Sequence, residues 1–148
     1  MGAADKRRSK ARLGGGSTRS IEANERAEPN AIPMLRRRAG DFAATHGGDA
    51  ALVERVELAV SEVVTNVVKY AYGSGDDGRV ELTATASEKL IEIKVADRGC
   101  GFLPGDSDGL GIGLTLVAQM SGDLEIAQSP QGTTVTMRFP LAPSAEAL

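Results

Sequence analysis

The sequence has one cysteine, one histidine and no tryptophan in 148 residues, and aromatic residues make up only 3% of it. With a single cysteine the chain cannot form an intramolecular disulfide, and no cluster of cysteines is available to hold zinc. A core with so few aromatic residues must be built from Val, Leu, Ile and Ala. These absences favour a reducing compartment, and we expect a cytoplasmic location.

Long apolar runs and an excess of basic charge are absent as well. No uninterrupted apolar stretch approaches the roughly 20 residues of a membrane-spanning helix, and the start lacks an apolar segment of signal-peptide length. The formal net charge is -3, which argues against a surface that neutralises nucleic-acid phosphates. We therefore expect neither a membrane nor a nucleic acid as a direct partner.

The length suits one domain with a core of ordinary size. Residues 1–17 combine a cluster of Lys and Arg with consecutive glycines, which predicts a disordered tail, with a docking arm as the alternative. Residues 142–148 are expected to form a C-terminal tail. Residues 18–141 contain no linker-like stretch, and we predict that they fold as a single domain.

Hydrophobic periodicity predicts a strand and two helices in the first half of this domain. Residues 18–24 alternate in the way typical of an edge strand. A helix is predicted from a possible cap at Asn30 to the glycine at Gly47. Residues 49–72 contain no Gly or Pro, and their apolar side chains recur every three or four positions, which predicts a long amphipathic helix.

The second half of the domain has the pattern of two strand pairs with a helix between them. Residues 79–86 and 90–96 alternate with period two around a short turn, and residues 123–128 and 132–139 do the same. The helix between the pairs follows a glycine-rich segment and ends at Gly122. This order predicts an α+β fold, a two-layer sandwich whose mostly antiparallel sheet carries its helices on one face.

Glu62 and Asn66 lie four positions apart in the predicted helix 49–72, beside its apolar stripe. A carboxylate can take a proton from a hydroxyl group, and the side-chain oxygen of Asn is a neutral ligand for Mg²⁺. The alternative is a pair of solvated surface residues, which the spacing alone does not exclude. The pair is a candidate site facing a bound phosphate.

The segment DRGCGF follows a predicted strand and contains Asp97, Gly99 and Gly101. An acid at this place can accept a hydrogen bond from the exocyclic amine of adenine, and glycines let a flat ligand approach the backbone. The alternative is a turn initiated by Asp, since Asp and Gly are common turn residues. The motif alone leaves both interpretations open.

Two more motifs follow along the chain. The segment GLGIGL places Gly109, Gly111 and Gly113 ahead of a helix, where unpaired N–H groups and the helix dipole attract phosphates. No βαβ unit surrounds it and no Gly-Lys-Ser/Thr follows, so it is neither a dinucleotide-binding fingerprint nor a Walker loop. In the segment GTT, a hydroxyl group of Thr133 or Thr134 can support Asp97, although Thr is also a common strand residue.

Taken in this order, the four motifs resemble those of the GHKL superfamily of ATP-binding domains, which have the Bergerat fold. Within that superfamily, the stretch ELAVSEVVTNVVKYAYG is similar to the bacterial anti-sigma factor serine/threonine-protein kinases. The resemblance covers residues 18–141.

The resemblance implies a role for each motif. Glu62 would be the general base, Asn66 the Mg²⁺ ligand, and Asp97 the residue that binds the adenine amine of ATP. Residues 102–110 would form a short lid over the nucleotide. Gly99 and Gly101 would lie beside the base. Gly109, Gly111 and Gly113 would lie near the phosphates. Thr133 or Thr134 would support the adenine pocket.

The implied function is transfer of the γ-phosphate of ATP to a serine of an anti-sigma-factor antagonist, together with sequestration of a sigma factor, by a protein expected to be a homodimer. Two alternatives are a non-catalytic ATP-binding module that holds a regulator, and a stand-alone ATPase. The stretch QMSGDLEI departs from the Met-Asp-Glu-Val-like sequence usual in these kinases, which leaves the identity of the partners open. The only histidine, His46, is expected to be an exposed residue at a helix end and not a phosphoacceptor.

Overall fold

The computed structural model describes residues 19–73, 77–99 and 117–142. Residues 117–120 are helical and precede β4. The order of elements confirms the predicted strand, two helices, two strands, helix and two strands. Those with assigned bounds are β1 (Arg19–Arg26), α2 (Ala31–Thr45), α3 (Ala50–Asn66), the π-helical turn η1 (Val67–Ala71), β2 (Arg79–Ala86), β3 (Leu90–Asp97), β4 (Asp123–Ser129) and β5 (Gly132–Pro140).

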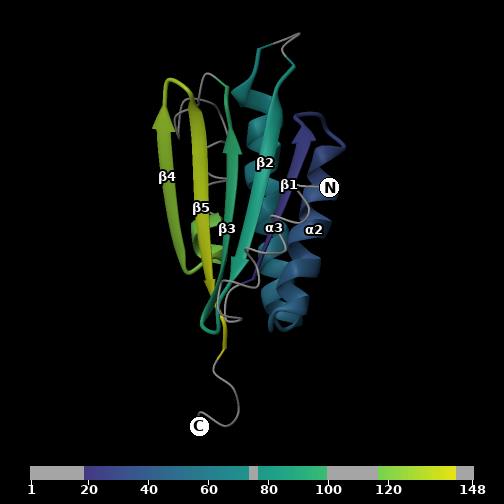
Figure 1. The fold of residues 1–148 in the computed structure, drawn as a ribbon, viewed down its shortest axis with the longest axis vertical. Coiled ribbons are helices and arrows are strands. Elements are labelled where there is room, and N and C mark those ends of the chain that lie inside the picture. The colour runs from purple at the N-terminus through teal and green to yellow at the C-terminus, as the bar shows by residue number, and fades with distance from the viewer. Residues whose placement is uncertain (1–18, 74–76, 100–116, 143–148) are drawn as a thin grey trace, which may run out of the picture.

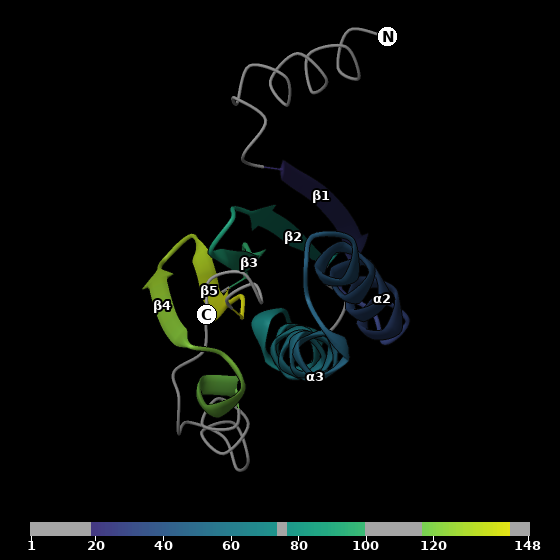
Figure 2. The same cartoon turned by 90° about the horizontal axis from the view of Figure 1, so that it is seen from below.

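The strands form one five-stranded antiparallel sheet in the order β1-β2-β3-β5-β4. Figure 1 shows the strands side by side with α2 and α3 behind them. In the view of Figure 2, both helices lie on the same side of the sheet. The predicted α+β sandwich with an antiparallel sheet and helices on one face is confirmed, and β1 is the edge strand that its alternation predicted.

The start of α3 is capped by its own sequence. The Asp49 side chain accepts a hydrogen bond of 2.8 Å from the backbone N–H of Leu52, which satisfies one of the free donors of the first turn. Asn30 occupies the corresponding position of α2, but its side chain makes no capping hydrogen bond. Asn30 therefore marks the predicted start of α2 without stabilising it.

The long helix predicted over residues 49–72 changes its winding near its end. It is an α-helix as far as Asn66, continues as the π-helical turn η1, and leaves the helical conformation at Tyr72. A π-helical turn is rare and is frequently found at functional sites. No helix in the described part of the chain has the length and apolar character needed to cross a membrane.

The core lies between the sheet and the two helices. Aliphatic side chains fill it, and its buried aromatic members among the described residues are Phe42 and Phe139. On β3 the buried residues alternate with more exposed ones, so that Ile91, Ile93 and Val95 face the helices. The composition thus produced the aliphatic core that was predicted.

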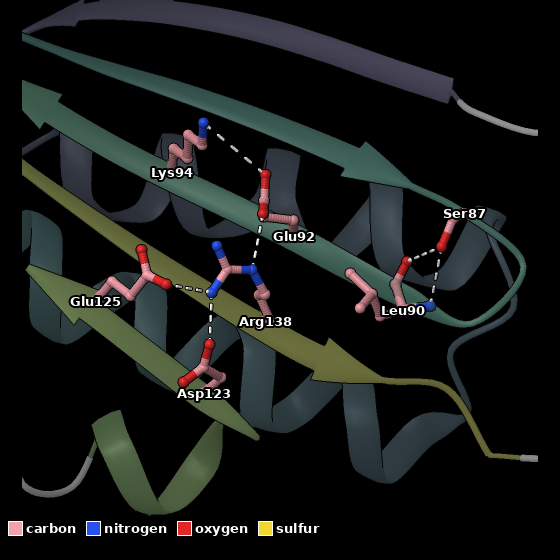
Figure 3. Close-up of polar contacts among 7 residues, drawn as sticks. All are labelled: Ser87, Leu90, Glu92, Lys94, Asp123, Glu125 and Arg138. Carbon is pink, nitrogen blue, oxygen red and sulfur yellow. Dashed lines mark hydrogen bonds and ion pairs between the residues drawn. The ribbon is translucent and has the colours of Figure 1, made fainter. Parts of the chain in front are cut away.

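The opposite face of the sheet is open and polar. Arg138 on β5 lies on this face and bonds to carboxylates on both neighbouring strands (Figure 3). Its Nε donates to Glu92 on β3 at 2.9 Å, and its Nη1 donates to Glu125 on β4 at 3.0 Å and to Asp123 on the same strand. These bonds tie three adjacent strands together on the side away from the helices.

Candidate functional site

Asp97 is the last residue of β3 and lies on the face of the sheet that the helices cover. It is 5% exposed and pairs in register with Thr133 of β5, which is 2% exposed. The Oγ1 atom of Thr133 is buried and has no hydrogen-bond partner among the described residues. A buried polar atom without a partner costs about 1–3 kcal/mol, so this arrangement is typical of a site that a ligand completes.

The structure shows which of Thr133 and Thr134 lies on the same face of the sheet as Asp97, a choice that the sequence left open. Successive side chains of a strand point to opposite faces of the sheet. Thr134 pairs with Ala96 and is only half-buried, on the open face. Thr133 is therefore the one of the two that shares the face of Asp97.

The Asp97 carboxyl group initiates a turn of the kind that the sequence left open as the alternative to ligand binding. Its Oδ1 accepts a hydrogen bond of 2.9 Å from the backbone N–H of Gly99. Burial raises the pKa of Asp97, and hydrogen bonds from the backbone of Gly99 and Thr133 partly offset this because they favour the carboxylate. The turn and a ligand contact are compatible, since a carboxylate has two oxygens that accept several hydrogen bonds.

Close backbone packing explains two glycines around Asp97. A Cβ atom at Gly99 would lie 1.8 Å from the carbonyl oxygen of Ala71 in η1. A Cβ atom at Gly132 would lie 2.0 Å from the carbonyl oxygen of Asp97, and Gly132 has a φ of 142°. Glycine at position 99 is thus required by the end of the long helix, a reason that differs from the predicted approach of a flat ligand.

Tyr72 is a supporting residue that sequence reasoning missed. Its hydroxyl group donates to the carbonyl oxygen of Arg79 at the start of β2 and accepts from the backbone N–H of Arg98 at 2.9 Å. The ring lies over Gly78, where a Cβ atom would come within 2.4 Å of it. Tyr72 therefore fixes the start of β2 and the end of β3 beside Asp97. Its place at the end of the predicted helix was the only signal in the sequence.

Glu62 and Asn66 occupy the last turns of α3, one above the other on the same side of the helix. Glu62 is half-buried. Asn66 is 7% exposed, and its Nδ2 atom is buried without a hydrogen-bond partner among the described residues. The helix continues as η1, where the backbone of Ala71 lies against Gly99. The C-terminal end of α3, which carries Asn66, and the end of β3, which carries Asp97, therefore lie in the same region.

The other candidate residues divide into two groups. Gly101, Gly109, Gly111, Gly113 and the lid at residues 102–110 lie outside the described residues. His46 lies at the opposite end of the sheet, near Leu141, to which the neighbouring Gly47 is close. It was expected to be exposed, but its ring packs 4.3 Å from that of Phe42, and burial followed by the charge of Arg19 lowers its pKa.

Comparison with known proteins identifies the family. The histidine kinase-like ATPase domain matches residues 26–139. The chain belongs to this family. The match includes Glu62, Asn66, Asp97 and Thr133, so every described candidate residue lies within the histidine kinase-like ATPase domain.

Relatives of this histidine kinase-like ATPase domain include bacterial protein kinases. The chain is 30% identical to the serine-protein kinase RsbW of Bacillus velezensis over 134 residues, which cover 79% of this chain and 82% of that protein. It is 32% identical to RsbW of a Listeria monocytogenes strain over 76 residues, or 51% of this chain and 48% of that protein. The chain thus matches about half the length of the Listeria relative.

Solved structures share the fold of this ATPase domain. The RsbU and RsbW domains of a Mycobacterium tuberculosis protein superpose with a TM-score of 0.70 at 22% identity, over 86% of this chain and 34% of that one. The histidine kinase domain of a blue-light activated kinase from Erythrobacter litoralis gives 0.54 at 23% identity, over 74% of this chain and 61% of that one. Both likenesses support the GHKL fold.

Proposed function

We propose that the protein is an ATP-dependent serine/threonine-protein kinase that acts as an anti-sigma factor. In this proposal it phosphorylates a serine of an antagonist protein and holds a sigma factor. The observation that carries the proposal is the place of the buried Asn66 side chain, whose Oδ1 would be the Mg²⁺ ligand, one helical turn after the Glu62 carboxylate. The similarity to proteins named serine-protein kinase RsbW supports it.

The described residues fit an ATP molecule with Mg²⁺. Asp97 provides acceptor oxygens for the adenine amine, and the unpartnered Thr133 hydroxyl group lies in register beside it. Asn66 offers its side-chain oxygen in place of a carboxylate cluster, and the described residues contain no group of three or more His, Cys, Asp or Glu side chains that could hold a metal. Because Mg²⁺ keeps several waters and shares phosphate oxygens, one amide ligand suffices.

Phosphate transfer in this site needs a group that accepts a proton. A bond forms between the serine Oγ of the antagonist and the γ-phosphorus, and the bond from that phosphorus to the oxygen of the departing ADP breaks. The serine hydroxyl proton passes to the Glu62 carboxylate, which also orients the hydroxyl group. Mg²⁺ held by Asn66 would offset negative charge on the phosphates. Asp97 and Thr133 fix the nucleotide at its other end.

A transfer assay tests the role of Glu62. The full chain is incubated with ATP labelled at the γ-phosphate and with candidate antagonist proteins, and label on serine is counted. We expect Glu62→Gln to reduce the transfer rate by about 10²–10⁴-fold, the usual contribution of a general base, with ATP affinity within about twofold of wild type. Glu54→Gln, at an exposed position two turns earlier on α3, serves as the matched control. Unchanged transfer by the Glu62 variant would contradict the assignment.

Sequestration of a sigma factor and the expected homodimer are tested separately. Proteins retained from cell extract by the immobilised chain are compared with and without ATP, and the mass of the free protein is measured by light scattering. The kinase proposal expects a sigma factor to be retained with ATP and released by the unphosphorylated antagonist. Retention of a sigma factor with no transfer to any protein would favour the non-catalytic binding module instead.

A further inference from the structure

The face of the sheet that the helices cover changes from apolar to polar along its strands. Three residues in register on β3, β5 and β4 make a row across the sheet. Two successive rows are apolar, and the third row, at the end of β3, is polar. The apolar rows are Ile93–Met137–Leu124 and Val95–Val135–Ile126, and the polar row is Asp97–Thr133–Gln128.

Gln128 is the member of the polar row to which the proposed site has given no role. On β4, Leu124 and Ile126 pack against the core, and by the alternation of the strand Gln128 points to the same face. The Nε2 atom of Gln128 is buried and has no hydrogen-bond partner among the described residues.

The polar row therefore holds two buried polar atoms that the described protein leaves unpaired, Oγ1 of Thr133 and Nε2 of Gln128. A third residue, Asp97, has its pKa raised by burial. Neighbouring strands are about 4.8 Å apart, so the row spans about 10 Å. Buried groups of this kind are normally satisfied, and two unpaired atoms in register with a buried carboxyl group on one face indicate a ligand that lies along all three residues.

We propose that the side-chain amide of Gln128 binds a ring nitrogen of the nucleotide base and so extends base recognition from Asp97 and Thr133 to β4. This inference rests on the proposed ATP site. The row offers an acceptor at Asp97, a hydroxyl group at Thr133 and a donor at Gln128. The edge of adenine offers the complementary series of an amine followed by two ring nitrogens that accept hydrogen bonds.

The same geometry specifies how the base lies. When Asp97 binds the exocyclic amine, the ring edge that carries carbon 2 and its two neighbouring nitrogens runs toward β4. An extra amine on carbon 2 would then lie next to Gln128. A glutamate at position 128 has the same shape but only acceptor oxygens, so it would lose the bond to the ring nitrogen and gain one to the extra amine.

The test measures nucleotide binding by calorimetry for the wild type, Gln128→Glu and Gln128→Leu, with ATP and with 2-aminoadenosine 5′-triphosphate as probes. Gln131→Glu is the matched control, because Gln131 is exposed in the β4–β5 turn and the change adds the same charge. Urea unfolding without nucleotide is measured for every variant.

We expect both Gln128 variants to bind ATP about tenfold more weakly than wild type, the effect of one lost hydrogen bond. The ratio of the dissociation constant for ATP to that for the 2-amino nucleotide should rise at least tenfold in Gln128→Glu and stay unchanged in Gln131→Glu. Gln128→Leu should unfold at the same or a higher urea concentration, because it removes an unpaired buried donor.

Wild-type affinity for ATP in both Gln128 variants would overturn the role of Gln128 and leave the proposed ATP site intact. A loss of stability with no change in the ratio of the two nucleotides would assign Gln128 to packing and also overturn the inference. Failure of the wild type to bind either nucleotide would instead overturn the proposed function, on which the inference depends.

Discussion

The Asp97 carboxyl group stands in surroundings that disfavour its charged form. Burial raises its pKa above the usual value of 3.8. Between the usual and the raised pKa the folded state binds more protons than the unfolded state, so the free energy of unfolding falls as the pH rises through that window. The destabilising effect is complete once the pH lies above the raised pKa, where the carboxylate would bind the amine of the nucleotide.

Asp97→Asn should therefore separate stability from binding. The amide cannot ionise, and its oxygen can still accept the Gly99 N–H. We expect the free variant at pH 7 to be at least as stable as wild type, while its ATP affinity falls about 10–100-fold through loss of a bond to a charged group. Urea unfolding from pH 4 to pH 8, with Asp41→Asn at an exposed site as the control, measures the first effect. An equal loss of stability at every pH would show that Asp97 acts only as a turn residue.

Gly99 is the second residue whose role the structure makes testable. In Gly99→Ala the added methyl group would overlap the carbonyl oxygen of Ala71, and neither backbone can give way cheaply. We expect unfolding to become easier by about 2–3 kcal/mol, the upper range for overpacking, and ATP affinity to fall because Asp97 is displaced. Calorimetry and urea unfolding measure both.

Gly47→Ala provides the comparison for this change. Its methyl group would lie no closer than 3.8 Å to Leu141, but its φ of 101° is unfavourable for alanine. It should lower stability by about 1–2 kcal/mol and leave ATP affinity unchanged, since it lies at the other end of the sheet. Equal effects of the two variants on ATP affinity would contradict the role of the Gly99–Ala71 contact.

The candidate residues differ in how far the sequence could predict them. Glu62 and Asn66 follow from helical spacing, and Asp97 follows from the end of a strand. The choice of Thr133 over Thr134 and the place of Gln128 depend on the register of β5 between β3 and β4. The contact of Gly99 with Ala71 depends on the π-helical turn. Both are tertiary features that no local pattern specifies.

At the scale of elements, the two long helices begin with caps of different quality. Asp49 makes a capping hydrogen bond at the start of α3, whereas Asn30 makes none at the start of α2. We expect Asp49→Ala to lower the free energy of unfolding by about 1 kcal/mol and Asn30→Ala to change it by less than about 0.5 kcal/mol. Urea unfolding of the two variants tests this, and equal effects would contradict it.

The elements themselves were largely predictable, for physical reasons that also set the limit. Alternation with period two identified β2, β3, β4 and β5, because one face of each is more buried than the other. The Val-rich stretch of η1 keeps helical spacing, so the pattern predicts an uninterrupted helix and cannot reveal a change of winding. The pairing of β3 with β5 joins segments more than thirty residues apart and follows only from the fold family that the motifs resemble.

In the whole molecule, the two faces of the sheet have different roles. The helix-covered face carries the core and, at one end, the row of Asp97, Thr133 and Gln128. The open face carries the Arg138 network, where the hydrogen bonds that Arg138 donates to Glu125, Asp123 and Glu92 raise the pKa of the guanidinium group further above its usual range. The ionic bonds that hold β3, β5 and β4 together therefore do not use the side chains proposed to bind ATP.

Arg138→Gln should accordingly lower stability without changing nucleotide binding. It removes the cation and leaves the carboxylates of Glu92, Asp123 and Glu125 close together on adjacent strands, where they repel one another. We expect the midpoint of urea unfolding to fall at low salt and the difference from wild type to shrink as NaCl is raised, because salt screens exposed charges.

The matched control for this network is Lys94→Gln. Its ammonium group lies 4.0 Å from Glu92 and its side chain is 51% exposed, so removal of the charge should have no measurable effect on the midpoint. ATP affinity, measured for both variants beside Asp97→Asn, should stay at the wild-type value because both side chains lie on the open face. The ATP affinity of Arg138→Gln could instead fall as far as that of Asp97→Asn. That result would show that the bonds of Arg138 between β3, β5 and β4 position the polar row, and that the two faces are coupled through the strands they share.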